Sequence, residues 1–225
     1  MNLNRTFPLL FVISVLMSFS VRAELSIQIT QGIDNPIPIA VVPFSWEGSG
    51  VLDEDIGEIV TADLQQVGEF RALSPSNMLA LPREEREVYY RDWSVLAQDY
   101  LLVGKVQRAP GSELIQVQYE FFDINREIKL AGEVLTGTTS QLRDIGHEIS
   151  NVVFELVTGT RGAFTTQILY IVSEFVSPEV SYFRLEKADY DGRRAQVLLE
   201  SREPIMSPSW SPNGQDIAYV SFETD

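Results

Sequence analysis

The spacing of hydrophobic residues before residue 160 predicts alternating strands and helices. Ile37 to Phe44 is almost continuously apolar and β-branched, which indicates a strand buried on both faces. Residues 53–67 have apolar side chains at helical spacing, with Asp53 as the expected N-cap and Gly68 as the stop. The same reasoning predicts strands over 25–30 and 70–73, a short helix over 92–98, and antiparallel strands over 100–106, 114–123 and 128–135.

A second, longer helix follows the last of these strands. Gly137 to Ser140 is expected to cap it, and Gly159 to end it. Its apolar stripe consists of Leu142, Ile145, Ile149, Val152, Val153 and Leu156. The predicted fold class is therefore α+β: residues 24–160 form a mixed α/β domain in which helices cover a largely antiparallel sheet.

After Gly162 the pattern changes to short strands separated by turns. Asp191-Gly192 and Asn213-Gly214 are strong hairpin signals. Four strands are expected, over 167–172, 181–189, 196–199 and 217–222. They predict about one blade of a β-propeller in residues 161–225, with further blades beyond the chain, because a blade needs neighbours to bury its faces. The alternative is a small β-unit packed on the α/β domain.

The first 23 residues have the layout of a secretory signal peptide. Arg5 precedes an apolar run of about 13 residues, and small residues stand three and one positions before a cleavage point between Ala23 and Glu24. A membrane-spanning helix would need roughly 20 apolar residues. We therefore expect an exported protein whose formal charge changes from −15 to −17 when Arg5 and Arg22 are removed. This acidity disfavours nucleic acid and anionic lipid as partners.

Few residues could support catalysis. The chain has no cysteine and a single histidine, His147, which falls outside the apolar stripe of its helix and is expected at the surface or its boundary. Cys/His nucleophiles and the usual zinc sets are thereby excluded. Asp189-x-Asp191-Gly192 resembles the opening of a calcium loop but lacks the rest, so a hairpin turn is the preferred interpretation. We expect no cofactor, no metal and no enzymatic activity.

Three segments, in order, resemble one family. They are Pro38 to Phe44 (PIAVVPF), Leu156 to Phe164 (LVTGTRGAF) with ILYIV at 168–172, and Pro208 to Gly214 (PSWSPNG) with Ile217-Ala218-Tyr219. Behind a signal peptide, this arrangement is similar to the TolB family, the periplasmic component of the Tol–Pal system. The resemblance implies an N-terminal α/β domain, a six-bladed propeller, and a role in outer-membrane integrity and cell division.

The resemblance also implies two protein partners. Inner-membrane TolA would bind the mature N-terminal segment, and the outer-membrane lipoprotein Pal would dock on the propeller, most of which lies outside this chain. Carried onto this sequence, the TolA-binding residues are Glu24, Leu25, Ser26, Ile27, Gln28, Ile29, Thr30, Gln31, Gly32, Ile33 and Asp34. A short alternating strand can pair with the sheet edge of another protein. It can equally complete the sheet of its own domain, and both readings stay open.

An enzyme is the alternative function. Trp-Ser-Pro-x-Gly blades also occur in exported serine peptidases, whose hydrolase domain would then lie beyond residue 225. The α/β domain before the propeller argues against this reading, and so does the family-like junction at Gly159 to Phe164.

Overall fold

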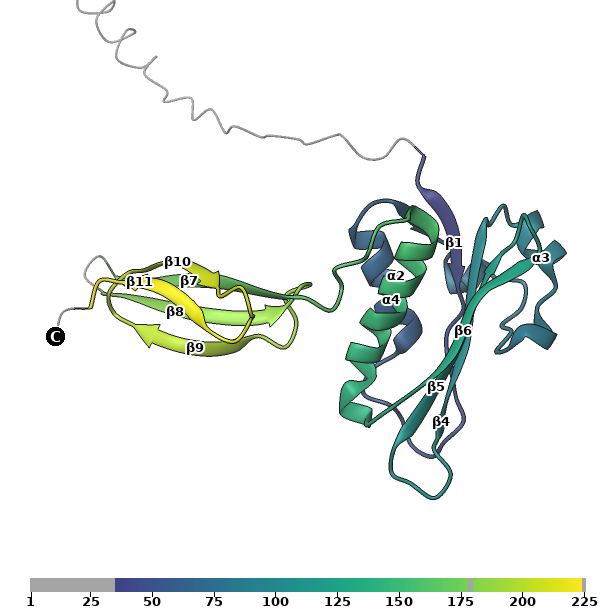
Figure 1. Cartoon of the computed structure of the whole chain (residues 1–225), viewed down its shortest axis with the longest axis horizontal. Coiled ribbons are helices and arrows are strands. Elements are labelled where there is room, and N and C mark those ends of the chain that lie inside the picture. The colour runs from purple at the N-terminus through teal and green to yellow at the C-terminus, as the bar shows by residue number, and fades with distance from the viewer. Residues whose placement is uncertain (1–34, 178–179, 224–225) are drawn as a thin grey trace, which may run out of the picture. The chain divides into compact units, whose positions relative to one another are not determined.

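The computed structural model describes residues 35–177 and 180–223 (Figure 1). The predicted strand over 25–30 and the signal peptide lie outside these residues. The first part of the described chain is α/β. Its elements are β1 (Ile37–Val41), β2 (Ser45–Trp46), α2 (Ile56–Gln66), β3 (Phe70–Ala72), α3 (Tyr90–Val95), β4 (Tyr100–Arg108), β5 (Ile115–Asp123), β6 (Ile128–Gly137) and α4 (Leu142–Thr158), with short 3-10 turns at Pro75–Asn77, Glu85–Glu87 and Thr139–Gln141.

The sheet is mixed, in the order β3-β1-β4-β5-β6, with β2 also paired to β4. The antiparallel meander β4-β5-β6 confirms the predicted hairpins. The other half differs from the prediction, because β1 pairs in parallel with both β3 and β4. Each parallel connection passes through a helix, which is how a chain returns to the same end of a sheet.

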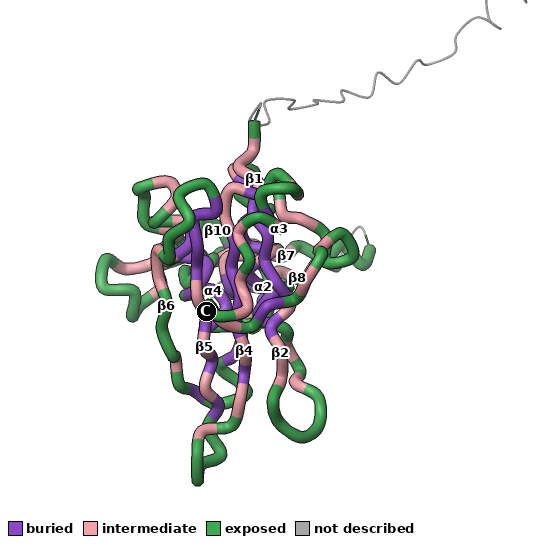
Figure 2. Tube along the Cα trace, turned by 90° about the vertical axis from the view of Figure 1, so that its right-hand side faces the viewer, coloured by how far each residue is buried: buried purple, intermediate pink, exposed green. Residues whose placement is uncertain are grey.

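Both faces of the central strands are covered, which explains the continuous apolar run in β1. Ile39 and Val41 pack into the core under α2 and α4, whereas Ala40 and Val42 pack with Trp93 of α3 on the other face. Figure 2 shows buried residues along the central strands, while β6 at the sheet edge is largely exposed. The sequence interpretation of a doubly buried strand is thereby confirmed.

Helix α2 begins two residues later than predicted. Asp55, not Asp53, is the N-cap: its Oδ1 accepts a hydrogen bond from the backbone N–H of Glu58 over 3.1 Å. Asp53 and Asp55 both have a side chain that can cap, and only the backbone geometry selects between them. Gly68 follows the helix with φ at +78°, which confirms it as the stop.

The other helices follow their local signals. Thr138 and Gln141 form a capping box before α4, and Gly159 ends it in the left-handed conformation. Helix α3 covers Tyr90–Val95, so the prediction of a short helix over 92–98 was right about the helix but wrong about its bounds.

The chain after residue 162 forms β7 (Gln167–Ser177), β8 (Val180–Asp189), β9 (Gln196–Ser201), β10 (Ile205–Trp210) and β11 (Ile217–Ser221). Strands β7-β8-β9 make one antiparallel sheet, and β10-β11 a second one. The sequence reading missed β10 because Ser207-Pro208 is a loop signal. The strand accommodates it with an irregularity between Met206 and Ser209, where Ser207 takes a positive φ of 52°.

Candidate interaction sites

The predicted TolA-binding segment, residues 24–34, and the cleavage residues Ala23 and Glu24 lie outside the described residues. The described chain begins at exposed Asn35 and enters β1, where the backbone N–H of Ile37 donates to the carbonyl of Glu69 over 2.8 Å. Those site residues therefore remain predictions.

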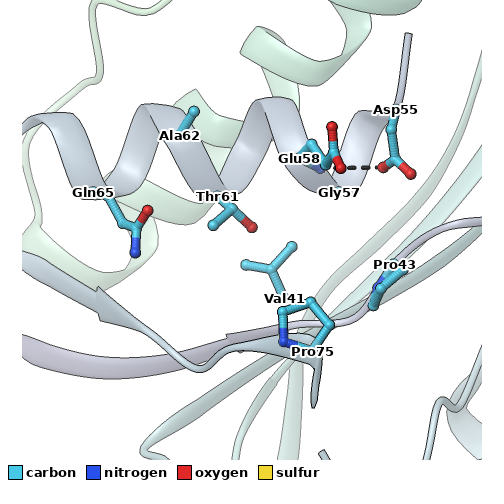
Figure 3. Close-up of a pocket in the computed structure, with 9 residues that line it drawn as sticks. All are labelled: Val41, Pro43, Asp55, Gly57, Glu58, Thr61, Ala62, Gln65 and Pro75. Carbon is cyan, nitrogen blue, oxygen red and sulfur yellow. Dashed lines mark hydrogen bonds between the residues drawn. The ribbon is translucent and has the colours of Figure 1, made fainter. Parts of the chain in front are cut away.

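A pocket of about 290 Å³ lies between β1 and α2 (Figure 3). Val41 and Pro43 form one wall, and Pro75 lies beside them. The opposite wall is a face of α2, on which Gly57 and Thr61 are one turn apart and Glu58 and Gln65 add polar side chains. A mostly apolar recess of this size could accommodate a hydrophobic side chain or a small ligand. Sequence reasoning missed it, although the spacing of Gly57, Thr61 and Gln65 marks one helix face.

A buried polar cluster connects α2, α4 and the turn after β8. Asp63 of α2 is its centre: Oδ2 lies 2.8 Å from Nδ1 of His147, and Oδ1 accepts the hydroxyl of Tyr190 over 2.6 Å. Asp63 and His147 are each only 2% exposed. Burial, reinforced by the hydrogen bond to Asp63, raises the pKa of the Tyr190 hydroxyl above its usual range. Tyr190 therefore acts as a neutral hydrogen-bond donor.

The prediction that His147 lies at the surface was wrong. The periodicity of α4 reports the face packed on the sheet, and His147 is off that face. A second face is covered by Tyr190, whose ring packs edge-on against the imidazole with centroids 5.4 Å apart. Sequence reasoning also missed Asp63 and Tyr190. The available signal was an aspartate inside the helical apolar pattern of 53–67.

Charged pairs surround this cluster. Arg143, 5% exposed, donates from Nε to Oδ2 of Asp189 over 3.2 Å and also pairs with Asp191. Arg194 bridges Asp189 and Asp144. Hydrogen bonds to Asp144 and Asp189 raise the pKa of the Arg194 guanidinium further. These ion pairs connect α4 to the end of β8 and to the residues between β8 and β9, and so hold these elements together.

Carboxylates at the end of β8 and at positions 84–85 also make local structural contacts. Asp189 ends β8 and Asp191 lies in the turn between β8 and β9, where Gly192 has a φ of +83°, which confirms the hairpin interpretation. Glu84 pairs with Lys105, and Glu85 with Lys129.

The β7–β11 segment exposes several large apolar side chains. Phe175 is 77% exposed and Phe222 is 53% exposed. A propeller blade buries such faces against the adjoining blades. Among the described residues, no helix has both the length and the apolar character needed to cross a bilayer.

Comparison with known proteins agrees with this architecture. Residues 25–130 match the TolB amino-terminal domain, and residues 154–225 match the TolB beta propeller domain. The Tol-Pal system protein TolB of Hahella chejuensis is 44% identical over 214 residues, covering 95% of this chain and 50% of that protein. Its counterpart in Pseudomonas aeruginosa is 44% identical over 208 residues, covering 92% of this chain and 48% of that protein.

A solved structure gives the same result. The crystal structure of TolB from Acinetobacter baumannii superposes with a TM-score of 0.75 at 30% identity, covering 88% of this chain and 47% of that one. The chain thus spans about half the length of the relatives that it matches. Because both domain models match in order and the solved structure shares this fold, the chain belongs to the TolB family and contains the amino-terminal domain and the start of the β-propeller.

Proposed function

We propose that this chain is part of a non-enzymatic periplasmic adaptor of the Tol–Pal system. It links inner-membrane TolA to the outer-membrane lipoprotein Pal and so maintains outer-membrane integrity and its invagination during cell division. The observation that carries the proposal is the ordered match to the two TolB domain models, supported by relatives named as Tol-Pal system proteins.

We place the first contact, with TolA, in residues 24–34, after cleavage behind Ala23. This segment is acidic at Glu24 and Asp34 and alternates apolar with polar residues between them. An added strand binds through main-chain hydrogen bonds, while side chains on one face fill pockets of the partner. Leu25, Ile27 and Ile29 would supply that face. Pal would bind on the propeller, of which residues 161–225 are the first part.

Titration calorimetry against the C-terminal domain of TolA tests this proposal. The mature chain from residue 24 is compared with one that begins at residue 35. We expect saturable binding by the first and none by the second, with similar unfolding curves for both. Strong destabilisation on removing 24–34, with TolA binding unchanged, would contradict the assignment.

Two triple variants sharpen the test, because they separate the two faces of the predicted strand. Alanine at Leu25, Ile27 and Ile29 should weaken TolA binding by at least tenfold. Alanine at Ser26, Gln28 and Thr30 should leave it nearly unchanged, since main-chain bonds do not depend on those side chains. Equal losses in both variants would argue against strand addition.

A separate comparison, with the downstream coding sequence, tests the peptidase alternative. If the coding sequence downstream of residue 225 encodes about five further blades and then a stop codon, the adaptor reading holds. A G-x-S-x-G nucleophile motif within a following α/β domain would instead support a peptidase.

A further inference from the structure

One ring nitrogen of His147 is hydrogen-bonded to Asp63, and the other has no partner among the described residues. Nδ1 is bonded to the carboxylate of Asp63, which can only accept when ionised, so Nδ1 carries the proton. In a neutral imidazole with this tautomer, Nε2 has a free lone pair that can bind a metal ion. Nε2 is buried and has no hydrogen-bond partner within the described residues. A buried polar atom without a partner is uncommon in proteins and calls for an explanation such as a bound ion or water.

Two carboxylates converge on the same ring. One oxygen of Asp189, one oxygen of Asp191 and a ring nitrogen of His147 all lie within 4.8 Å of one another. Around a tetrahedral ion with bonds of about 2.1 Å, neighbouring ligand atoms are about 3.4 Å apart. Small rotations of the two aspartate side chains would therefore close this set around one ion.

The charge around the set favours a cation. Four carboxylates (Glu54, Asp144, Asp189 and Asp191) pair here with two guanidinium groups, Arg143 and Arg194. A fifth carboxylate, Asp63, bonds to His147. By formal count, these five carboxylates outnumber the two guanidinium groups by three. A carboxylate has about four lone-pair sites, so Asp189 and Asp191 can keep their arginine partners and still bind an ion.

The geometry points to a divalent transition-metal site formed by His147 Nε2, Asp189 and Asp191, with Asp63 holding the imidazole in place. One nitrogen and two oxygen ligands suit Zn²⁺, whereas the imidazole disfavours Ca²⁺ and Mg²⁺. The carboxylate behind the histidine is the usual outer-shell partner of a metal-binding imidazole.

An open pocket borders this site at Asp63 and Asp191. This second pocket, of about 340 Å³, is lined by Asp63, Arg143 and Asp191. It would admit the ion and supply water for the remaining coordination position. A bound ion would connect α4 directly to the end of β8 and the β8–β9 turn. It would add to the hydrogen bond of Tyr190 and the ion pairs of Arg143, which already connect the helices to this turn.

Calorimetric titration of the metal-stripped protein with Zn²⁺ tests the site. We expect one ion per chain. His147→Asn keeps an amide nitrogen near the place of Nδ1, and so keeps the bond to Asp63, but it removes the Nε2 ligand. This variant and Asp191→Asn should each weaken Zn²⁺ binding by at least tenfold. Glu58→Gln, an exposed change on the rim of the second pocket, should not.

A spectroscopic measurement keeps the test decisive if a variant fails to fold. X-ray absorption at the zinc edge of the loaded wild-type protein should show scattering from a single imidazole among oxygen ligands. No zinc binding by the folded protein, equal binding by His147→Asn, or the absence of imidazole scattering would overturn the proposal. Nε2 would then be satisfied by a buried water, and any zinc bound would be adventitious.

Discussion

Tyr190 donates its hydroxyl to Oδ1 of Asp63 over 2.6 Å, joining two residues that lie 127 positions apart in the sequence. Asp63 is buried in α2, and Tyr190 follows β8. The bond is therefore a direct connection between α2 of the α/β domain and the β8–β9 turn of the propeller segment.

Replacing Tyr190 with phenylalanine should lower the free energy of unfolding by about 1–3 kcal/mol. The change removes one donor and leaves a buried, charged acceptor short of a partner. Urea unfolding measures the difference. Tyr219→Phe is the matched control, because Tyr219 is 44% exposed and should change stability by less than about 0.5 kcal/mol. Equal effects of the two substitutions would show that the Asp63 bond contributes nothing.

The start of α2 gives a second prediction. Asp55→Ala should cost about 1 kcal/mol, since the N–H of Glu58 loses its acceptor. Asp55→Asn should cost much less, because asparagine also caps. Asp53→Ala, at the position that the sequence pattern favoured, should be nearly neutral in the same unfolding assay. A larger loss at Asp53 than at Asp55 would move the helix start back to the predicted residue.

Local signals predicted much of this fold. Hairpins, strand runs and helix stops depend on neighbouring residues, so Gly68, Gly159 and the β4-β5-β6 meander could be identified in advance. The parallel pairing of β1 with β3 and β4 could not be identified. It depends on which strand edges meet after the helices fold back, and no local pattern encodes that choice.

The buried cluster shows the same limit more sharply. His147 is placed correctly on α4 by the sequence pattern, but its burial is decided by Tyr190, 43 positions later. The helix that contains Asp63 was predicted from its apolar residues. One polar residue inside such a helix does not reveal which residues it will contact. Long-range polar contacts of this kind are the part of a candidate site that one sequence cannot supply.

Close packing of β4 against Phe44 gives a third prediction. A Cβ at Gly104 would lie 2.1 Å from Cε1 of Phe44, inside a buried core. Gly104→Ala should therefore destabilise the protein by about 1–3 kcal/mol or more through overpacking. Gly132→Ala in β6 is the control, since its Cβ would meet its nearest neighbour only at 3.4 Å. If both variants unfold at the same urea concentration, Phe44 can move aside without cost.

At the contact between α4 and α2, helix propensity favours alanine, whereas packing favours glycine. Alanine is favoured over glycine inside a helix by about 1 kcal/mol. At Gly146, however, a Cβ would lie 2.8 Å from Cγ2 of Ile59 on α2. Gly146→Ala should therefore destabilise the wild-type protein, because the two helices cannot stay at this distance. In an Ile59→Ala background, where Cγ2 is absent, the same substitution should become neutral or stabilising.

A double-mutant cycle by urea unfolding measures this reversal of sign, and we expect a coupling of about 0.5–3 kcal/mol between the two positions. Purely additive effects would mean that the helices separate freely to admit a methyl group. In that case Gly146 would be present for a reason other than the approach of α4 to α2.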